Sequence, residues 1–281
     1  VTVRGVEVVS PGPNNDGCNP ESSTDVLVED SVFDTGDDCI AIKSGRNADG
    51  RRLAAPSERI VVRGCRMRAG HGGVTIGSEA TGGVRDVFVE RCVMSSPDLE
   101  RGLRIKTNAR RGGRIEGVYV RDVEIGEVGT AIDVDLLYEE GADGPFAPVV
   151  RDLRIDRLTV ERARRALFVR GLPGSPVEGL RLRDSVFRAR AEPSRLENVG
   201  DVVLRGVVMA PARASKLARP DVSATSGRTS CPSRTATHSP SRSTGNSSTP
   251  PGAAGRPSVA SSSCCSLGAR SAARMGTRWT T

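Results

Sequence analysis

Eight segments of the chain share one pattern of hydrophobic and polar positions. Each reads apolar–x–apolar, then two mostly polar or glycine positions, with an apolar residue soon after, as in VTVRGVEV (residues 1–8) and IVVRGCRM (60–67). Alternation with a period of two indicates a β-strand, because successive side chains of a strand point to opposite faces. The other six segments are residues 26–33, 87–94, 118–125, 153–160, 180–187 and 202–209.

The third position of these segments forms an apolar column whose members lie 22 to 35 residues apart. Such irregular spacing indicates constant strands joined by loops of variable length, and it argues against a helical repeat of fixed length. We therefore predict an all-β fold, a parallel β-solenoid in which each coil covers the edge of the next. The column consists of Val3, Val28, Val62, Val89, Val120, Ile155, Leu182 and Leu204.

The repeat covers residues 1–210, which we predict to be one domain. Residues 211–281 are rich in Ser, Thr, Ala, Pro and Arg, so we interpret them as a low-complexity tail that is disordered or not native to the protein. Val1 already lies inside a strand pattern, and we expect that earlier coils are missing from this chain.

The formal net charge of +7 would favour nucleic acid as a partner, but its distribution argues against this. Residues 211–281 hold ten of the 41 basic residues and one of the 34 acidic ones, which leaves −2 on residues 1–210. We therefore expect no nucleic-acid partner. No run of about 18 apolar residues is present, so we expect no membrane span.

The seven cysteines show no C-x-x-C pair and no zinc-type spacing with histidine, so we expect no metal site. Cys65 and Cys92 occupy the same position of two neighbouring segments. Stacking of small apolar residues in the core explains this better than a disulfide, which remains the alternative.

Six polar side chains with catalytic potential follow the strands of four consecutive coils, nine to seventeen residues after the third position of each segment. Similar depth in adjacent coils means adjacency in space, at about 5 Å per coil. We therefore predict that the six share one face of the solenoid, although a loop of solvated charges is the simpler alternative. They are Asp16, Asp37, Asp38, His71, Arg104 and Lys106.

Neighbouring carboxylates cannot all ionise easily, so one of them should hold its proton to a higher pH than the others. Such a set supplies both the acid and the base that glycoside hydrolysis requires. An arginine and a lysine beside them would bind an anionic sugar.

Four motifs carry a family resemblance: NNDG (14–17), GDD (36–38), GHG (70–72) and RIK (104–106). In this order and spacing they resemble polygalacturonases of glycoside hydrolase family 28, over about residues 1–170. The context GHGGVTIGSE and LRIKTNARRGG is similar to bacterial members, which are often exo-acting. The resemblance implies a right-handed, single-stranded parallel β-helix and inverting hydrolysis of polygalacturonate with no metal or other cofactor.

The resemblance also implies catalytic roles. Asp37 matches the general acid that protonates the glycosidic oxygen, and Asp16 and Asp38 match the bases that hold and activate water. His71 matches the histidine that supports the protonation of the acid.

Binding roles follow in the same way. Arg104 and Lys106 match the pair that binds the galacturonate carboxylate, Asn14 matches an asparagine near the substrate, and Tyr138 in DLLYEEG (135–141) matches a substrate-contacting tyrosine. The family motif is usually Asn-Thr-Asp, and Asn15 replaces its threonine here; we expect little loss from that change.

The expected substrate is therefore polygalacturonate or pectin, cut at α-1,4-galacturonosyl linkages by a monomeric, secreted or periplasmic enzyme. Three alternatives stay open: a calcium-dependent pectate lyase, a rhamnogalacturonan hydrolase, and a non-catalytic β-solenoid that binds carbohydrate. Trp279 and His238 lie in the tail, and no aromatic platform for a sugar is evident in residues 1–210.

Overall fold

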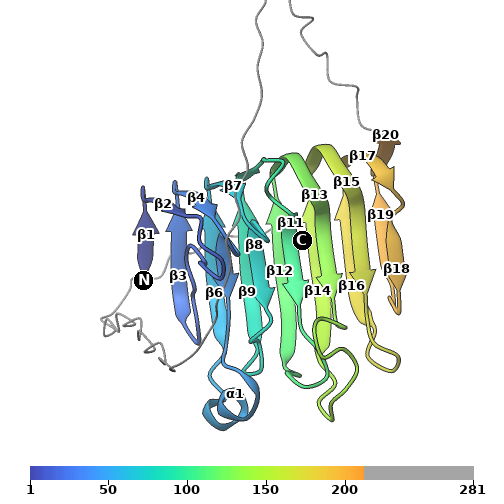
Figure 1. Cartoon of the computed structure of the whole chain (residues 1–281). Helices are drawn as coiled ribbons and strands as arrows, with labels where there is room; N and C mark the ends of the chain where they lie inside the picture. The colour runs from blue at the N-terminus through green and yellow to red at the C-terminus, as the bar shows by residue number, and fades with distance from the viewer. Residues whose placement is uncertain (212–281) are drawn as a thin grey trace, which may run out of the picture. The chain divides into compact units, whose positions relative to one another are not determined.

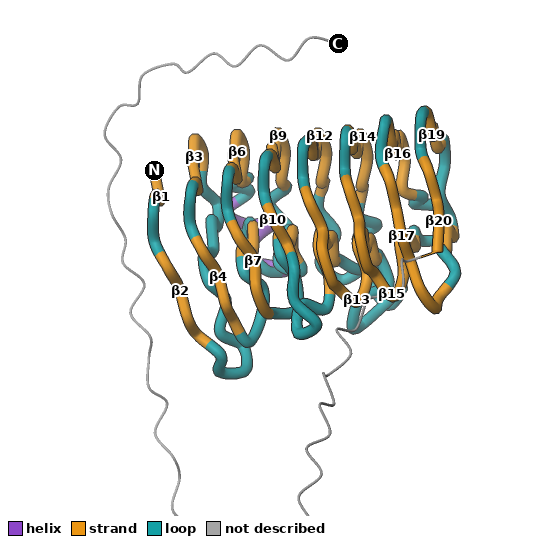
Figure 2. Tube along the Cα trace, turned by 90° about the horizontal axis from the view of Figure 1, so that it is seen from above, coloured by secondary structure: helices purple, strands orange, loops and turns teal. Residues whose placement is uncertain are grey.

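The computed structural model describes residues 1–211, which form twenty strands and one helix. The strands coil into a parallel β-helix, seen from the side in Figure 1 and from above in Figure 2. The solenoid prediction is confirmed. The predicted tail, with His238 and Trp279, lies outside the described residues from position 212 onward. None of the helical segments in the described part is long and apolar enough to cross a membrane.

The first sheet has eight parallel strands, one from each coil. Its register aligns Val3 with Val28 and continues through every member of the predicted apolar column to Leu204. The strands are β1 (Thr2–Arg4), β3 (Thr24–Glu29), β6 (Ser57–Arg63), β9 (Val84–Glu90), β12 (Arg114–Arg121), β14 (Val149–Asp156), β16 (Val177–Arg183) and β19 (Val202–Arg205).

The second sheet has twelve strands in two runs, joined by the long strands β13 (Glu124–Asp135) and β15 (Thr159–Arg170), which take part in both. The first run also contains β2 (Glu7–Ser10), β4 (Val32–Thr35), β7 (Arg66–Ala69), β10 (Val93–Met94), β17 (Val186–Glu192) and β20 (Val208–Pro211). The second run also contains β5 (Ile40–Ile42), β8 (Val74–Gly77), β11 (Arg101–Lys106) and β18 (Arg195–Glu197).

One residue with left-handed backbone turns each coil from the first sheet into the second. It is the fifth position of every repeat segment, where φ lies between 46° and 64°. Glycine adopts this conformation without steric cost, and aspartate tolerates it better than most residues, which explains why the column favours them. Its members are Gly5, Asp30, Gly64, Arg91, Asp122, Arg157, Asp184 and Gly206.

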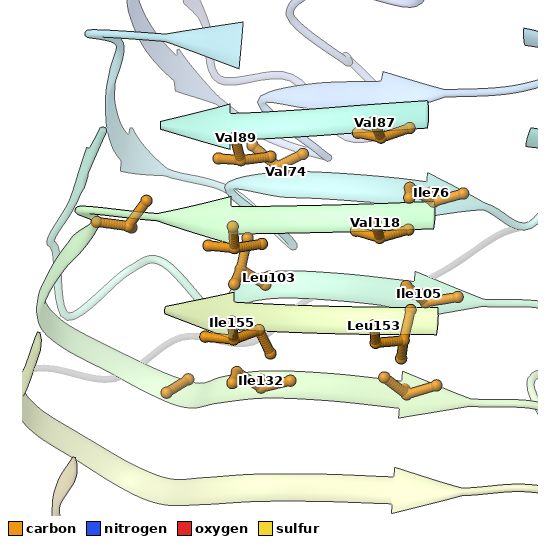
Figure 3. Packing of buried hydrophobic residues seen from close by; sticks show 14 of the residues in the cluster. Val74, Ile76, Val87, Val89, Leu103, Ile105, Val118, Ile132, Leu153 and Ile155 are labelled. Carbon is orange, nitrogen blue, oxygen red and sulfur yellow. The ribbon is translucent and has the colours of Figure 1, made fainter. Parts of the chain in front are cut away.

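The core is a stack of aliphatic side chains, one layer for each coil (Figure 3). Val74, Leu103 and Ile132 follow one another in register along the second sheet and face the column of the first. Each such side chain contributes about 1.5–3 kcal/mol when fully buried. Cys65 and Cys92 are buried in this core and free, which confirms the stacking interpretation over the disulfide.

Alternating charges run along the outside of the first sheet, at the fourth position of the repeat segments. Glu29 pairs with Arg63 and Arg4 on either side, and Glu90 pairs with Arg121 at 2.8 Å and Arg63 at 4.0 Å. Hydrogen bonds from Arg63 and Arg4 lower the pKa of Glu29. Neighbouring coils are thus joined by charge as well as by backbone hydrogen bonds.

These ion pairs between neighbouring coils of the first sheet predict that the fold is sensitive to acid. Because the pKa of Glu29 is lower in the folded than in the unfolded state, its stabilisation is complete above the unfolded value of about 4.3 and is lost as the pH falls through the folded value. We expect a lower melting temperature at pH 3 than at pH 6, measured by circular dichroism. The variant Glu29→Gln should show a smaller difference between the two; an identical difference would contradict the prediction.

Candidate active site

The six predicted residues lie together on the outside of the second sheet. Three loops supply the acids and the imidazole: residues 11–23 hold Asp16, residues 36–39 hold Asp37 and Asp38, and residues 70–73 hold His71. Strand β11 supplies the cations, in register with β8 and β5 of the two preceding coils. The stacking of coils therefore produces the predicted cluster.

The three aspartates converge on one point. Each offers a carboxylate oxygen within 4.8 Å of the other two. The backbone N–H of Asp38 donates to Oδ1 of Asp16 at 3.1 Å and to Oδ1 of Asp37 at 2.9 Å. Two carboxylates from different coils are thus fixed by one amide.

Asp16 has two partners that the sequence reasoning missed. Its Oδ2 accepts from Nζ of Lys43 at 2.8 Å and from Nδ2 of Asn19 at 2.8 Å. Burial alone would lower the pKa of Lys43, but the hydrogen bond and charge of Asp16 outweigh it, so the pKa is raised. Lys43 therefore stays charged at neutral pH and compensates the charge of Asp16.

Asp38 is the buried member of the cluster, with 1% of its surface exposed. Nζ of Lys106 lies 2.8 Å from Oδ2, and Oδ1 is contacted by Oγ1 of Thr75 at 2.8 Å and Nη1 of Arg104 at 3.4 Å. The two cations expected to bind substrate thus also balance the charge of Asp38, one of the two predicted bases. Such compensation is required, because an unpaired buried carboxylate is costly.

Asp37 differs from the other two because its side-chain partner is an imidazole. Nδ1 of His71 lies 3.0 Å from its Oδ1, and no lysine or arginine of residues 1–211 forms an ion pair with it. The other ring nitrogen, Nε2, lies 3.8 Å from Oε1 of Glu100, another residue that the sequence reasoning missed.

The position of the Asp38 side chain leaves no room for a Cβ at residue 72, which is a glycine. A Cβ at Gly72 would lie 2.2 Å from Oγ1 of Thr75 and 2.9 Å from Oδ1 of Asp38. We expect Gly72→Ala to separate these two oxygens and to lower kcat at least about tenfold, since small misplacements of catalytic groups are costly. Initial rates of reducing-end release measure it. Gly200→Ala is the control, because its Cβ would meet nothing closer than 3.5 Å; equal rates in the two variants would refute the requirement.

Tyr138 follows β13 and faces the cations. Its ring centroid lies 5.4 Å from the guanidinium of Arg104 and 5.2 Å from Nζ of Lys106. Burial, and then the charge of Glu139, raise the pKa of Tyr138 to about 12. The buried Arg111 holds the following turn through Glu139 at 3.2 Å and Glu140 at 3.3 Å.

Asn14 is the predicted site residue that the structure does not join to the cluster. It is exposed in a turn, with a left-handed φ of 59°, and no hydrogen bond connects its side chain to the three aspartates.

Two of the missed residues, Lys43 and Thr75, could have been found in the sequence. They occupy outward positions of the alternating segments CIAIKS and GVTIGS, as Arg104 and Lys106 do in GLRIKT. Asn19 and Glu100 lie in loops, where no alternating pattern in the sequence could have indicated them.

The carboxylate cluster is close enough to hold one cation. Two of its oxygens, Oδ2 of Asp16 and Oδ2 of Asp38, already accept the ammonium groups of Lys43 and Lys106. A divalent ion bound to all three acids would compete with these groups.

Comparison with known proteins identifies the family. The model of glycosyl hydrolases family 28 matches residues 1–184. The chain belongs to this family. It is 29% identical over 203 residues to a probable polygalacturonase of Vitis vinifera, covering 70% of this chain and 41% of that protein. It is 36% identical over 109 residues to an exo-poly-alpha-D-galacturonosidase of Dickeya chrysanthemi, covering 39% and 18%.

A solved family member supports the fold assignment. The crystal structure of a hyperthermoactive exopolygalacturonase from Thermotoga maritima superposes with a TM-score of 0.71 at 38% identity. The match covers 74% of this chain and 47% of that chain. The chain spans less than half the length of the relatives that it matches here.

Proposed function

We propose that this chain carries the active site of a polygalacturonase that hydrolyses α-1,4-galacturonosyl linkages from one end of polygalacturonate. The observation that supports this most is the unequal pairing of three converging aspartates: Asp16 and Asp38 each face a lysine, and Asp37 faces His71. Ammonium groups favour charged carboxylates. Asp37, without one, is the best suited to carry a proton to the leaving oxygen.

The reaction is a single displacement. Asp37 donates its proton to the glycosidic oxygen, and the bond from that oxygen to the anomeric carbon breaks. Water oriented by Asp16 and Asp38 attacks the anomeric carbon from the other face and passes a proton to one of these two carboxylates. Arg104 and Lys106 bind the galacturonate carboxylate by charge-assisted hydrogen bonds. Because the substrate is a plant cell-wall polymer, the enzyme acts after secretion or in the periplasm.

The stereochemical outcome is a separate prediction. Inverting enzymes usually keep their carboxyl groups about 6.5–9.5 Å apart, whereas oxygens of these aspartates lie within 4.8 Å. Inversion therefore rests on the family resemblance, with water held by Asp16 and Asp38 on the face of the sugar opposite Asp37. Proton NMR of the first products should show the β-anomer; an initial α-anomer would mean retention.

A pectate lyase is the second candidate, because three acids within 4.8 Å could hold calcium. A lyase also needs an arginine or lysine to act as a base, and Arg104 and Lys106 are both engaged with Asp38. One assay separates the proposals. Incubation with polygalacturonate should release saturated monomer with or without a chelator; a ladder of oligomers would indicate endo action, and an unsaturated, ultraviolet-absorbing end would indicate a lyase.

A further inference from the structure

The outward face that carries the active-site cations continues past them over the next three coils. In the register of the second sheet, Arg104 is followed by Asp133, Phe168 and Arg195. With about 4.8 Å between neighbouring strands, Phe168 lies about 10 Å along the stack from Arg104. A substrate that leaves the site along this face would reach it.

Phe168 is surrounded by three guanidinium groups. Their central carbons lie 5.3 Å (Arg165), 5.3 Å (Arg170) and 5.8 Å (Arg195) from the ring centroid. Phe168 is partly exposed, and it is the one aromatic residue that the described strands of this run, from β5 to β18, place on the outward face. We call Phe168, Arg170 and Arg195 the distal platform.

Ion pairs hold the platform arginines in place. Arg170 donates from Nε at 2.9 Å and from Nη2 at 2.8 Å to the carboxylate of Asp135, and Arg195 pairs with Glu197. A guanidinium has five N–H donors, so these contacts leave donors for another acceptor. The side chain of Arg195 is 51% exposed, which makes it accessible to a ligand.

The acid between the two cationic groups is shielded. Asp133 is 8% exposed and accepts from Nε of Arg101 at 3.3 Å. Burial raises its pKa, although the charges of Arg101 and Arg104 oppose this. Its burial and its ion pair with Arg101 shield its charge from a uronate passing over the face.

We propose that the distal platform binds a second uronic acid residue of the same polymer, two to three coils beyond Arg104; this rests on the proposed function. The apolar C–H face of the pyranose packs on the ring of Phe168. Its carboxylate bonds to the free donors of Arg170 or Arg195, for which the planar guanidinium is well suited. The platform therefore adds affinity for long chains and none for a dimer.

The test compares chain lengths. For the full chain, we expect Phe168→Ala to raise KM on long polygalacturonate about tenfold, the order expected for loss of one aromatic contact, with kcat unchanged and with both constants unchanged on digalacturonate. Phe168→Tyr should resemble the wild type. The control is Phe88→Ala, which removes a partly exposed ring from β9 of the first sheet.

Each outcome has a consequence. If the wild type hydrolyses both substrates and Phe168→Ala changes neither or both equally, the platform is refuted and the proposed function stands. If the wild type releases no reducing ends, calorimetric titration with long oligogalacturonates decides: tighter binding by the wild type than by the variant supports the platform alone, and no binding overturns both. If Phe168→Ala has a lower melting temperature than the wild type, Arg195→Gln replaces it in the test, because the side chain of Arg195 is half-exposed.

Discussion

Replacing Asp37 with asparagine should lower kcat on polygalacturonate by about 10²–10⁴-fold, the range attributed to loss of general acid catalysis. The amide keeps the size of the side chain and can still contact His71, 3.0 Å away in the wild type. It has no acidic proton to transfer to the leaving oxygen. Substrate affinity should change little, because the two cations that we propose to bind the uronate, Arg104 and Lys106, remain in place.

Turnover by the Asp37→Asn variant is measured as reducing-end release under saturating substrate, and binding as the shift in melting temperature caused by galacturonate oligomers. Asp34→Asn is the matched control, since Asp34 lies on β4, outside the three-aspartate cluster. A loss below tenfold in the Asp37 variant would show that the proton comes from another group.

Replacing Lys106 with methionine should also lower activity strongly. Its Nζ lies 2.8 Å from Oδ2 of Asp38, and the two side chains are 10% and 2% exposed. Lys106→Met leaves a buried carboxylate without its main partner, a change that typically costs about 3–5 kcal/mol. It also removes one of the two groups that we propose to bind the uronate. We expect kcat/KM to fall by about 10²–10³-fold and the melting temperature to decrease.

The variant Lys106→Arg distinguishes the effect of the positive charge from the effect of the compact shape of the ammonium group. It keeps the positive charge but not the compact ammonium that Asp38 accepts, so it should restore the melting temperature more than kcat/KM. Arg68→Met removes an exposed cation paired with Glu7 and should leave both quantities unchanged. Wild-type kcat/KM in Lys106→Met would exclude Lys106 from substrate binding.

Much of the fold could be predicted from the sequence. The period of two and the recurring third position specify strands and their inward column, because a parallel stack must place the same residue type at the same depth in every coil. The registers from Val3 to Leu204 reproduce that column. At the fifth position of the repeat segments, the sequence shows only that glycine and aspartate are frequent. The structure shows that the backbone there is left-handed in every coil.

The sequence by itself determined which of the predicted catalytic residues meet, since similar depth in successive coils brings Asp16, Asp37, Asp38 and His71 to one face. The tertiary structure decided which of them pair. Lys43 pairs with Asp16 and Lys106 pairs with Asp38, whereas no hydrogen bond joins the side chain of Asn14 to any of the three aspartates. Pairing depends on side-chain reach between coils and on loop conformation, and spacing along the chain encodes neither of these.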